Sequence, residues 1–154
     1  MKKLLFLLGV ILVSITGCKK DNVQDGIDHQ LIVDYLQKNN LTASAKHTGS
    51  GLYYIITTPG DSTRALSTST VYIHYVGTLL DGTQFDSSNE YSEQPIQMVL
   101  SSSIKGFAEG LRLYGKGGKG KLFIPSSLGY GSTASGSIPA NSVLVFDIEL
   151  VKFI

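Results

Sequence analysis

The residues whose types and positions could do chemistry in this chain are mostly aromatic and lie near the ends of the predicted elements. They are Tyr75, Phe85, Asp86, Ile104, Phe107, Tyr130 and Phe146. Core packing alone accounts for Phe107 and Phe146, but it accounts poorly for Tyr130, a large ring between two glycines on a loop. The set predicts one aromatic pocket with a single carboxylate, that of Asp86, at its rim.

Other catalytic chemistries are disfavoured by the same sequence. The run at 115–121, GKGGKGK, has the glycine and lysine spacing of a phosphate-binding loop, but a helix precedes it, a strand follows it, and Leu122 stands where Ser or Thr is needed. It is predicted to be a basic turn. The three histidines, His29, His47 and His74, have no metal-ligand spacing, and no serine lies in a nucleophile elbow. We therefore expect no metal, no cofactor and no covalent catalysis.

The elements that must position these residues follow from periodicity and turn residues. Alternation over 71–76, followed by Asp81-Gly82, predicts a β-hairpin whose return strand ends at Phe85 and Asp86. The apolar spacing of 101–114 predicts a helix that stops at the glycines that follow it. Further strands are predicted at 51–58, 94–100, 121–124 and 142–153. This order indicates an α+β domain in which an antiparallel sheet wraps a short helix.

The last strand and the loop before it carry two further expectations. Alternation puts one set of side chains inward and the other outward: Leu144, Phe146, Ile148 and Leu150 inward, and Val143, Val145, Asp147 and Glu149 outward. The loop at 125–141 is rich in Gly, Ser, Ala and Pro. A loop of this length in a compact domain is usually either functional or disordered.

Residues 1–17 are predicted to be a signal peptide, because lysines precede an apolar run that is short for a membrane span. The run ends at Cys18, the only cysteine in the chain, after small residues that resemble the lipobox of bacterial lipoproteins. This implies cleavage before Cys18, acylation of its thiol, and a protein anchored through Cys18 to a membrane of the bacterial cell envelope, facing the periplasm or on the cell surface. The alternative is an ordinary secretory signal with an incidental cysteine. A single cysteine also leaves no disulfide within the chain.

Residues 18–50 are expected to form a tether and a short helix ahead of the main domain. The polar segment 19–26 is the tether, and Asp25 or Asp28 caps the helix. The helix carries a narrow apolar stripe of Ile27, Leu31, Tyr35, Ile32 and Leu36. Such a stripe favours docking on its own domain over a contact between two copies, so we expect a monomer.

The charge balance gives no sign of a nucleic-acid partner. Cleavage after residue 17 removes Lys2 and Lys3 from the 13 basic side chains and none of the 12 acidic ones, which leaves a net charge of about −1. Nucleic-acid binding calls for a basic stripe, which this sequence lacks.

Four segments in order resemble the FKBP-type peptidyl-prolyl cis-trans isomerases. They are YIHYVGTLLDGTQFDSS at 72–88, SIKGFAEGL at 103–111, GYG at 129–131 and IPANSVLVFDIELVKF at 138–153. The resemblance covers residues 51–154, which we expect to form the isomerase domain. It implies the family fold, an antiparallel sheet of five to six strands curled around one short helix.

The resemblance also assigns roles to the residues at matching positions. It implies catalytic roles for Tyr75, Asp86, Tyr130 and Phe146, and substrate-binding roles for Phe85, Ile96, Met98, Ile104, Phe107 and Ile138. In the family, aromatic rings hold a prolyl ring over a floor at the Phe107 position. The N–H at the Ile104 position and the hydroxyl at the Tyr130 position donate to peptide carbonyls, and the carboxylate at the Asp86 position lies beside the twisting bond.

The chain departs from the family pattern at several of these positions. Phe107 stands where many members have tryptophan, and Ile96 and Met98 stand where phenylalanines are common. No arginine in 87–94 is available to pair with the pocket aspartate. We expect Tyr91 or the backbone of 87–88 to hold that aspartate instead.

The sequence therefore predicts an isomerase that accelerates rotation of Xaa-Pro bonds in exported proteins and so helps them fold. Its partners would be proline-containing unfolded or exported polypeptides, and the resemblance implies the family's macrolide inhibitors as further ligands. The alternative is a binding module of the same fold that captures proline-containing segments with little or no turnover. The departures from the family pattern favour that alternative.

Overall fold

The computed structural model describes residues 20–88 and 94–154, so Cys18 and the predicted signal peptide lie outside the described residues. The elements in chain order are α1 (Lys20–Lys38), β1 (Lys46–His47), β2 (Tyr53–Thr58), β3 (Thr70–Leu79), β4 (Gln84–Ser87), β5 (Ile96–Val99), η2 (Leu100–Ser102), α2 (Lys105–Leu111), β6 (Gly118–Ile124), η3 (Ser126–Leu128) and β7 (Leu144–Phe153). The elements η2 and η3 are single turns of 3-10 helix.

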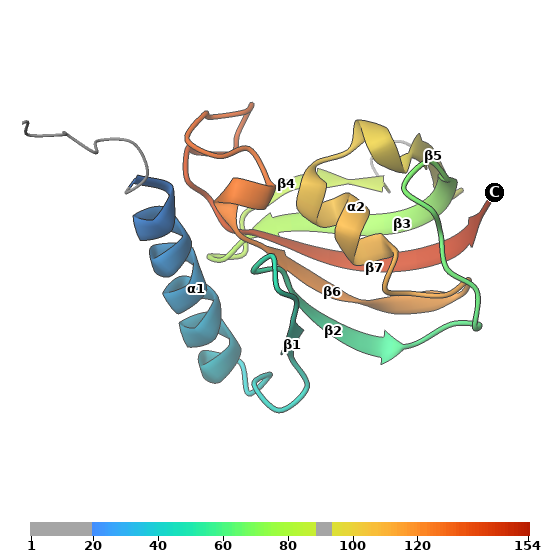
Figure 1. The fold of residues 1–154 in the computed structure, drawn as a ribbon, viewed down its shortest axis with the longest axis horizontal. Coiled ribbons are helices and arrows are strands. Elements are labelled where there is room, and N and C mark those ends of the chain that lie inside the picture. The colour runs from blue at the N-terminus through green and yellow to red at the C-terminus, as the bar shows by residue number, and fades with distance from the viewer. Residues whose placement is uncertain (1–19, 89–93) are drawn as a thin grey trace, which may run out of the picture.

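The strands form one antiparallel sheet in the order β1-β2-β6-β7-β3-β4. β5 pairs with residues 70–73 of β3, and β4 pairs with residues 76–78 of the same strand. The short helix α2 lies across one face of the sheet (Figure 1). The predicted α+β fold is confirmed, although the described sheet has seven strands rather than five or six. The two-residue β1 extends it at one edge.

The hairpin predicted at Asp81-Gly82 joins β3 to β4. The Leu79 N–H donates to the Thr83 carbonyl at 2.9 Å, and the Gly82 N–H donates to the Leu79 carbonyl at 3.0 Å. Asp81 Oδ1 accepts the Thr83 N–H at 2.8 Å. This bond to the backbone favours the charged carboxylate, so it lowers the pKa of Asp81.

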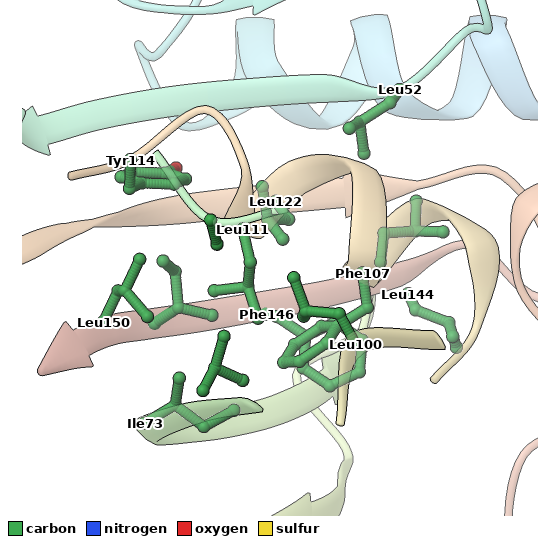
Figure 2. Packing of buried hydrophobic residues seen from close by; sticks show 14 of the residues in the cluster. Leu52, Ile73, Leu100, Phe107, Leu111, Tyr114, Leu122, Leu144, Phe146 and Leu150 are labelled. Atoms are coloured by element: carbon green, nitrogen blue, oxygen red, sulfur yellow. The ribbon is translucent and has the colours of Figure 1, made fainter. Parts of the chain in front are cut away.

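The main core lies between α2 and the sheet. Gly106 and Gly110 lie one turn apart on the face of α2 toward β6, where a Cβ on either would collide with Ile124 or Leu122. Their missing side chains let the helix approach the strand closely, at the expense of helix propensity. Figure 2 shows the side chains that fill the space around this contact, among them Leu100, Leu111, Tyr114, Leu144 and Leu150.

α1 packs on the opposite face of the sheet, where it closes a second apolar cluster. The buried members of this cluster are Ile32, Leu36, Tyr53, Ile55, Phe123, Val143 and Val145. The helix therefore docks on its own domain, as expected. Val143 and Val145 point away from Leu144 and Phe146, as predicted, but they are buried, because α1 covers that face.

The start of α1 also differs from the expectation. The helix begins at Lys20, so residues 20–26, predicted to be tether, are helical. Asp25 and Asp28 lie inside the helix and do not cap it. Ile27 and Leu31 of the predicted stripe remain 49% and 43% exposed, and the docked row is that of Ile32 and Leu36.

The glycine–lysine run at 115–121 is only partly a turn. α2 ends at Leu111, ahead of the glycines that were expected to stop it, and β6 begins at Gly118 rather than at residue 121. β6 starts early because it pairs on both edges, with Leu150 of β7 opposite Gly118 and Thr58 of β2 opposite Lys119.

Neither a membrane-spanning helix nor a metal cluster is found in the part of the chain that the structure describes. No helix among these residues is long and apolar enough to cross a membrane. No three His, Cys, Asp or Glu side chains among them gather around a point that could hold a metal ion.

Tyr114 supplies a test of the core. Its ring is fully buried, and its hydroxyl donates to the carbonyls of Ile55 at 2.9 Å and Lys121 at 3.2 Å. Tyr114→Phe should lower the free energy of unfolding by about 1–2 kcal/mol, because these carbonyls lose a buried donor. Tyr72→Phe is the matched control, because the Tyr72 ring lies under Lys152 on the face of the sheet away from α2. Its free energy of unfolding, measured with urea, should change little.

The same residue predicts a response to alkaline pH. Burial, and to a smaller extent the neighbouring Tyr54, raises the pKa of Tyr114 above its usual value. The unfolded chain then loses this proton first, so the free energy of unfolding should fall as the pH rises above about 10. An equal fall in the Tyr114→Phe variant would show that other groups cause it.

Candidate active site

The site is built on a row of residues that crosses the neighbouring strands β4, β3 and β7. Asp86 pairs with Gly77, and Gly77 pairs with Phe146. Residues directly opposed in an antiparallel sheet point to the same face. Strand pairing therefore brings the carboxylate of Asp86 and the ring of Phe146 to the α2 side of the sheet.

A β-bulge brings Phe85 to the same side. Gly77 pairs with Asp86 but Thr78 pairs with Gln84, so Phe85 is an additional residue in β4. In a regular strand Phe85 and Asp86 would point to opposite faces. Because a bulge re-aims the side chains beside it, the Phe85 ring instead lies edge-on to Phe146, with 5.5 Å between the ring centroids.

Gly77 makes room for this arrangement. A Cβ at residue 77 would lie 2.6 Å from Cε2 of Phe85 and 3.0 Å from Cε1 of Phe146. The two rings thus occupy the space that any side chain on Gly77 would need. The sequence prediction missed this residue, although a glycine inside an alternating strand is a known signal of a bulge or close approach.

Three further aromatic contacts build the wall of the site. The Phe107 and Phe146 rings meet at a centroid distance of 4.8 Å, and the Tyr75 ring lies 5.9 Å from each of them. The Tyr75–Phe107 and Phe107–Phe146 pairs, at interplanar angles of 74° and 61°, are edge-to-face, an arrangement that aromatic pairs prefer, and the Tyr75–Phe146 pair is tilted at 59°. Figure 2 shows Phe107 on α2 beside Phe146 on β7.

Among the residues that the structure describes, Tyr75 and Ser87 hold Asp86, and no arginine does. The Tyr75 hydroxyl donates to its Oδ2 at 2.6 Å, and the Ser87 N–H donates to its Oδ1 at 2.8 Å. The expected contact with the backbone of 87–88 is therefore present at Ser87, whereas Tyr91 lies outside the described residues. These bonds fix the direction of a half-buried carboxylate.

A cavity of about 390 Å³ opens between these strands, α2 and the loop after β6. Its lining contains most of the predicted site residues: Tyr75, Asp86, Ile96, Met98, Ile104, Phe107, Tyr130 and Phe146. Phe85 and Ile138 are not part of this lining; Phe85 supports Phe146 from behind, and Ile138 is buried in the main core. Ser102 and Ser103 also line the cavity, and the sequence prediction missed them. Their one signal was their position directly before Ile104.

Two lining residues could donate hydrogen bonds to a peptide. Ile104 precedes α2 with an extended backbone, φ −61° and ψ 148°, so its N–H is outside the helical hydrogen-bond ladder. Tyr130 is 42% exposed and stands at the mouth of the cavity on the loop after η3. The cavity thus combines an apolar wall with donors at its edge.

A second hollow of about 310 Å³ lies over β2, β6, β7 and β3, and its lining includes two lysines and two acidic residues. Lys119 pairs there with Glu149 at 2.9 Å, and Lys121 pairs with Asp147. These cations and carboxylates satisfy one another across the sheet surface. The aromatic cavity is therefore the candidate active site.

Comparison with known proteins agrees with this geometry. The model of the FKBP-type peptidyl-prolyl cis-trans isomerase family matches residues 61–151. FkpA of Aeromonas hydrophila, an FKBP-type peptidyl-prolyl cis-trans isomerase, is 43% identical over 138 residues, which are 89% of this chain and 50% of that protein. A probable FKBP-type isomerase of Haemophilus influenzae is 48% identical over 107 residues, 69% of this chain and 44% of that protein.

Solved structures share the fold. The crystal structure of FkpA from Escherichia coli has a TM-score of 0.74 and 36% identity, covering 87% of this chain and 61% of that chain. A peptidyl-prolyl cis-trans isomerase of Pseudomonas syringae has a TM-score of 0.72 and 27% identity, covering 90% of this chain and 98% of that chain. The chain spans about half the length of the curated relatives that it matches.

The chain belongs to the FKBP-type peptidyl-prolyl cis-trans isomerase family. The resemblance found in the sequence is thereby confirmed at the level of family and fold.

Gly77 gives a test of how the site is assembled. Gly77→Ala should displace the Phe85 ring, lower stability by about 1–3 kcal/mol and weaken binding of a proline-containing peptide, because added volume in a packed region forces neighbours aside. Gly49→Ala is the control, since a Cβ there meets nothing within 4 Å. Thermal unfolding and peptide titration measure both effects. Normal stability and binding in Gly77→Ala would mean that the close approach is unimportant.

Proposed function

We propose that the protein is a peptidyl-prolyl cis-trans isomerase that accelerates rotation of Xaa-Pro bonds in exported polypeptides. One observation carries the proposal: a cavity of about 390 Å³ walled by Tyr75, Phe107 and Phe146, with the oriented carboxylate of Asp86 in its lining. This volume suits a prolyl ring with its neighbouring peptide groups.

Rotation about the peptide bond is slow because amide resonance resists it, with a barrier of about 18–20 kcal/mol. In the twisted transition state resonance is lost, so the carbonyl becomes less polar and the nitrogen more amine-like. An apolar cavity that favours the twisted form over both planar forms lowers the barrier. Preferential binding by a few kcal/mol corresponds to about 10²- to 10⁴-fold in rate.

Five of the groups around the cavity have a role in this scheme. Phe107 and Phe146 exclude water from the prolyl ring, while the Ile104 N–H and the Tyr130 hydroxyl donate to peptide carbonyls and hold the segment. The fixed charge of Asp86 repels a polar carbonyl oxygen more than the less polar one of the twisted form. The Ser103 hydroxyl donates to the Leu100 carbonyl at 2.8 Å, so it serves the backbone.

The test is a protease-free assay with an unfolded protein whose refolding is limited by a Xaa-Pro bond. The purified protein should accelerate that refolding. Asp86→Ala and Phe146→Ala should each lower the catalysed rate by about tenfold or more, whereas Tyr130→Phe should lower it by about two- to fivefold, because one hydrogen bond is lost. Phe146→Ala also opens a cavity that lowers stability by about 3–5 kcal/mol, so its folded fraction must be measured.

Matched controls separate the site from general damage. Leu150→Ala deletes a buried side chain of β7 that does not line the cavity, and Asp147→Ala deletes an exposed carboxylate on the α1 side of the sheet. Both should keep the activity per folded molecule. Full activity in folded Asp86→Ala and Phe146→Ala would show that the cavity is not the active site.

A binding module of the same fold is the second candidate, and the composition of the cavity wall favours it. Phe107 is smaller than the tryptophan common at its position, and Ile96 and Met98 give a softer wall. Binding of a Xaa-Pro peptide without acceleration of refolding would support this function. In that case Phe107→Trp is the first substitution to test for restored turnover.

The setting of the site in the cell is part of the proposal. The signal peptide and Cys18 favour a lipid-anchored protein of the cell envelope, in the periplasm or on the cell surface, with exported proteins as substrates. The docking of α1 on its own domain favours a monomer. The cavity is also a candidate site for the macrolide inhibitors of the family, with Ile96 and Met98 in their contact surface.

Cys18 allows a direct test of anchoring. Cys18→Ser should abolish incorporation of labelled fatty acid in cells and move the protein from the membrane fraction to the soluble fraction, because the thiol is the acyl acceptor and stable anchoring needs more than one chain. Ser14→Ala is the control and should remain in the membrane fraction. Unchanged labelling of Cys18→Ser would place the anchor elsewhere.

A further inference from the structure

Among the residues that the structure describes, Asp28 is the only buried one with a charged side chain. It has no part in the reaction proposed above. It is fully buried within α1. A carboxylate removed from water is strongly destabilising unless hydrogen bonds replace its hydration. A buried carboxylate that does not line the cavity therefore calls for a structural reason.

Three hydrogen bonds hold this carboxylate. Oδ2 accepts the Ser126 N–H at 2.7 Å and the Ser126 hydroxyl at 2.6 Å, and Oδ1 accepts Nε2 of Gln24 at 2.8 Å. Ser126 is itself buried and lies 98 residues further along the chain. Two of the three bonds thus join α1 to the start of η3.

Ser126 in turn holds the loop that carries Tyr130. η3 follows Pro125, which supplies no side-chain cap, so Asp28 acts as the cap from another helix. The Ser126 carbonyl accepts the N–H of Gly129 at 2.9 Å and the N–H of Gly131 at 2.8 Å. These are the residues on either side of Tyr130. The direction of the Tyr130 side chain is therefore tied to the position of Ser126.

α1 is a fixed support for this contact. Ile32 and Leu36 bury the helix against the sheet, and the Tyr35 ring lies 5.7 Å from that of Phe123 on β6. The helix, the Asp28 carboxylate and Ser126 form a continuous path of packed contacts. It runs from the face of the sheet that α1 covers to the mouth of the cavity.

We propose that Asp28 is a positioning residue for the isomerase site, acting through Ser126 to hold the Tyr130 hydroxyl at the cavity. The catalytic part of this inference rests on the proposed function, because it assigns Asp28 an effect on turnover. The structural part, that Asp28 orders the 126–131 turn, is independent of it.

The test compares Asp28→Asn with a matched substitution on the same helix. In Asp28→Asn the amide oxygen can still accept from Ser126 but carries no charge, so those bonds are weaker, and the amide nitrogen in place of Oδ1 cannot accept Nε2 of Gln24. Asp34→Asn is the control, since Asp34 accepts Nε2 of Gln30 at 2.7 Å in the same i, i+4 arrangement but is exposed. Both variants change the net charge equally.

Asp28→Asn should lower the catalysed refolding rate by about two- to fivefold, and by no more than Tyr130→Phe does, because it acts through the same hydroxyl; Asp34→Asn should leave the rate unchanged. In NMR hydrogen exchange, the amides of Gly129 and Gly131 should exchange faster in Asp28→Asn while the β6–β7 amides keep their protection. Should Asp28→Asn fail to fold, Ser126→Ala removes only the bond from the Ser126 hydroxyl. It should lower the catalysed rate and speed the exchange of the Gly129 and Gly131 amides in the same direction, but by a smaller amount.

A double-mutant cycle separates positioning from general stabilisation. If Asp28 acts through the Tyr130 hydroxyl, Asp28→Asn should have little further effect on the rate in the Tyr130→Phe background. An effect of full size in that background, or unchanged exchange at Gly129 and Gly131, would overturn the proposal. A wild-type protein without turnover would instead refute the proposed function, and the exchange of these two amides would still decide whether Asp28 orders the turn.

Discussion

β3 holds the candidate site together, because it pairs with β7 along one edge and with β4 and β5 along the other. Its residue Gly77 has Asp86 as one neighbour and Phe146 as the other. Since opposed residues share a face, the ladder itself sets the carboxylate and the ring side by side. The missing side chain at Gly77 then gives the Phe85 and Phe146 rings their space.

The two faces of the sheet serve different purposes. On one face α2 packs closely through Gly106 and Gly110 and brings Phe107 and Ile104 to the cavity. On the other face α1 buries its own apolar cluster and reaches around to the η3 loop through Asp28. The cavity is therefore shaped by helices on both sides of the same sheet.

Much of this could be predicted from the sequence, because periodicity and turn residues are local signals. Local signals indicated the strands β3 and β7 through their alternation and the helix α2 through its apolar spacing. The Asp81-Gly82 pair indicated the turn that joins β3 to β4. The motif order indicated the family, and the family supplied most of the residues that line the cavity. Local signals failed at element ends, where pairing with a neighbour extended β6 back to Gly118.

The sequence by itself thus determined the fold class, the core face of β7 and the aromatic character of the site. Only the tertiary structure decided three features: the bulge that turns Phe85 toward Phe146, the covering of Val143 and Val145 by α1, and the capping of Ser126 by Asp28. The physical reason is that each depends on a contact between segments far apart in the chain, 98 residues apart for Asp28 and Ser126. Such a contact leaves no periodic pattern in either segment, so it becomes visible only when the chain is folded.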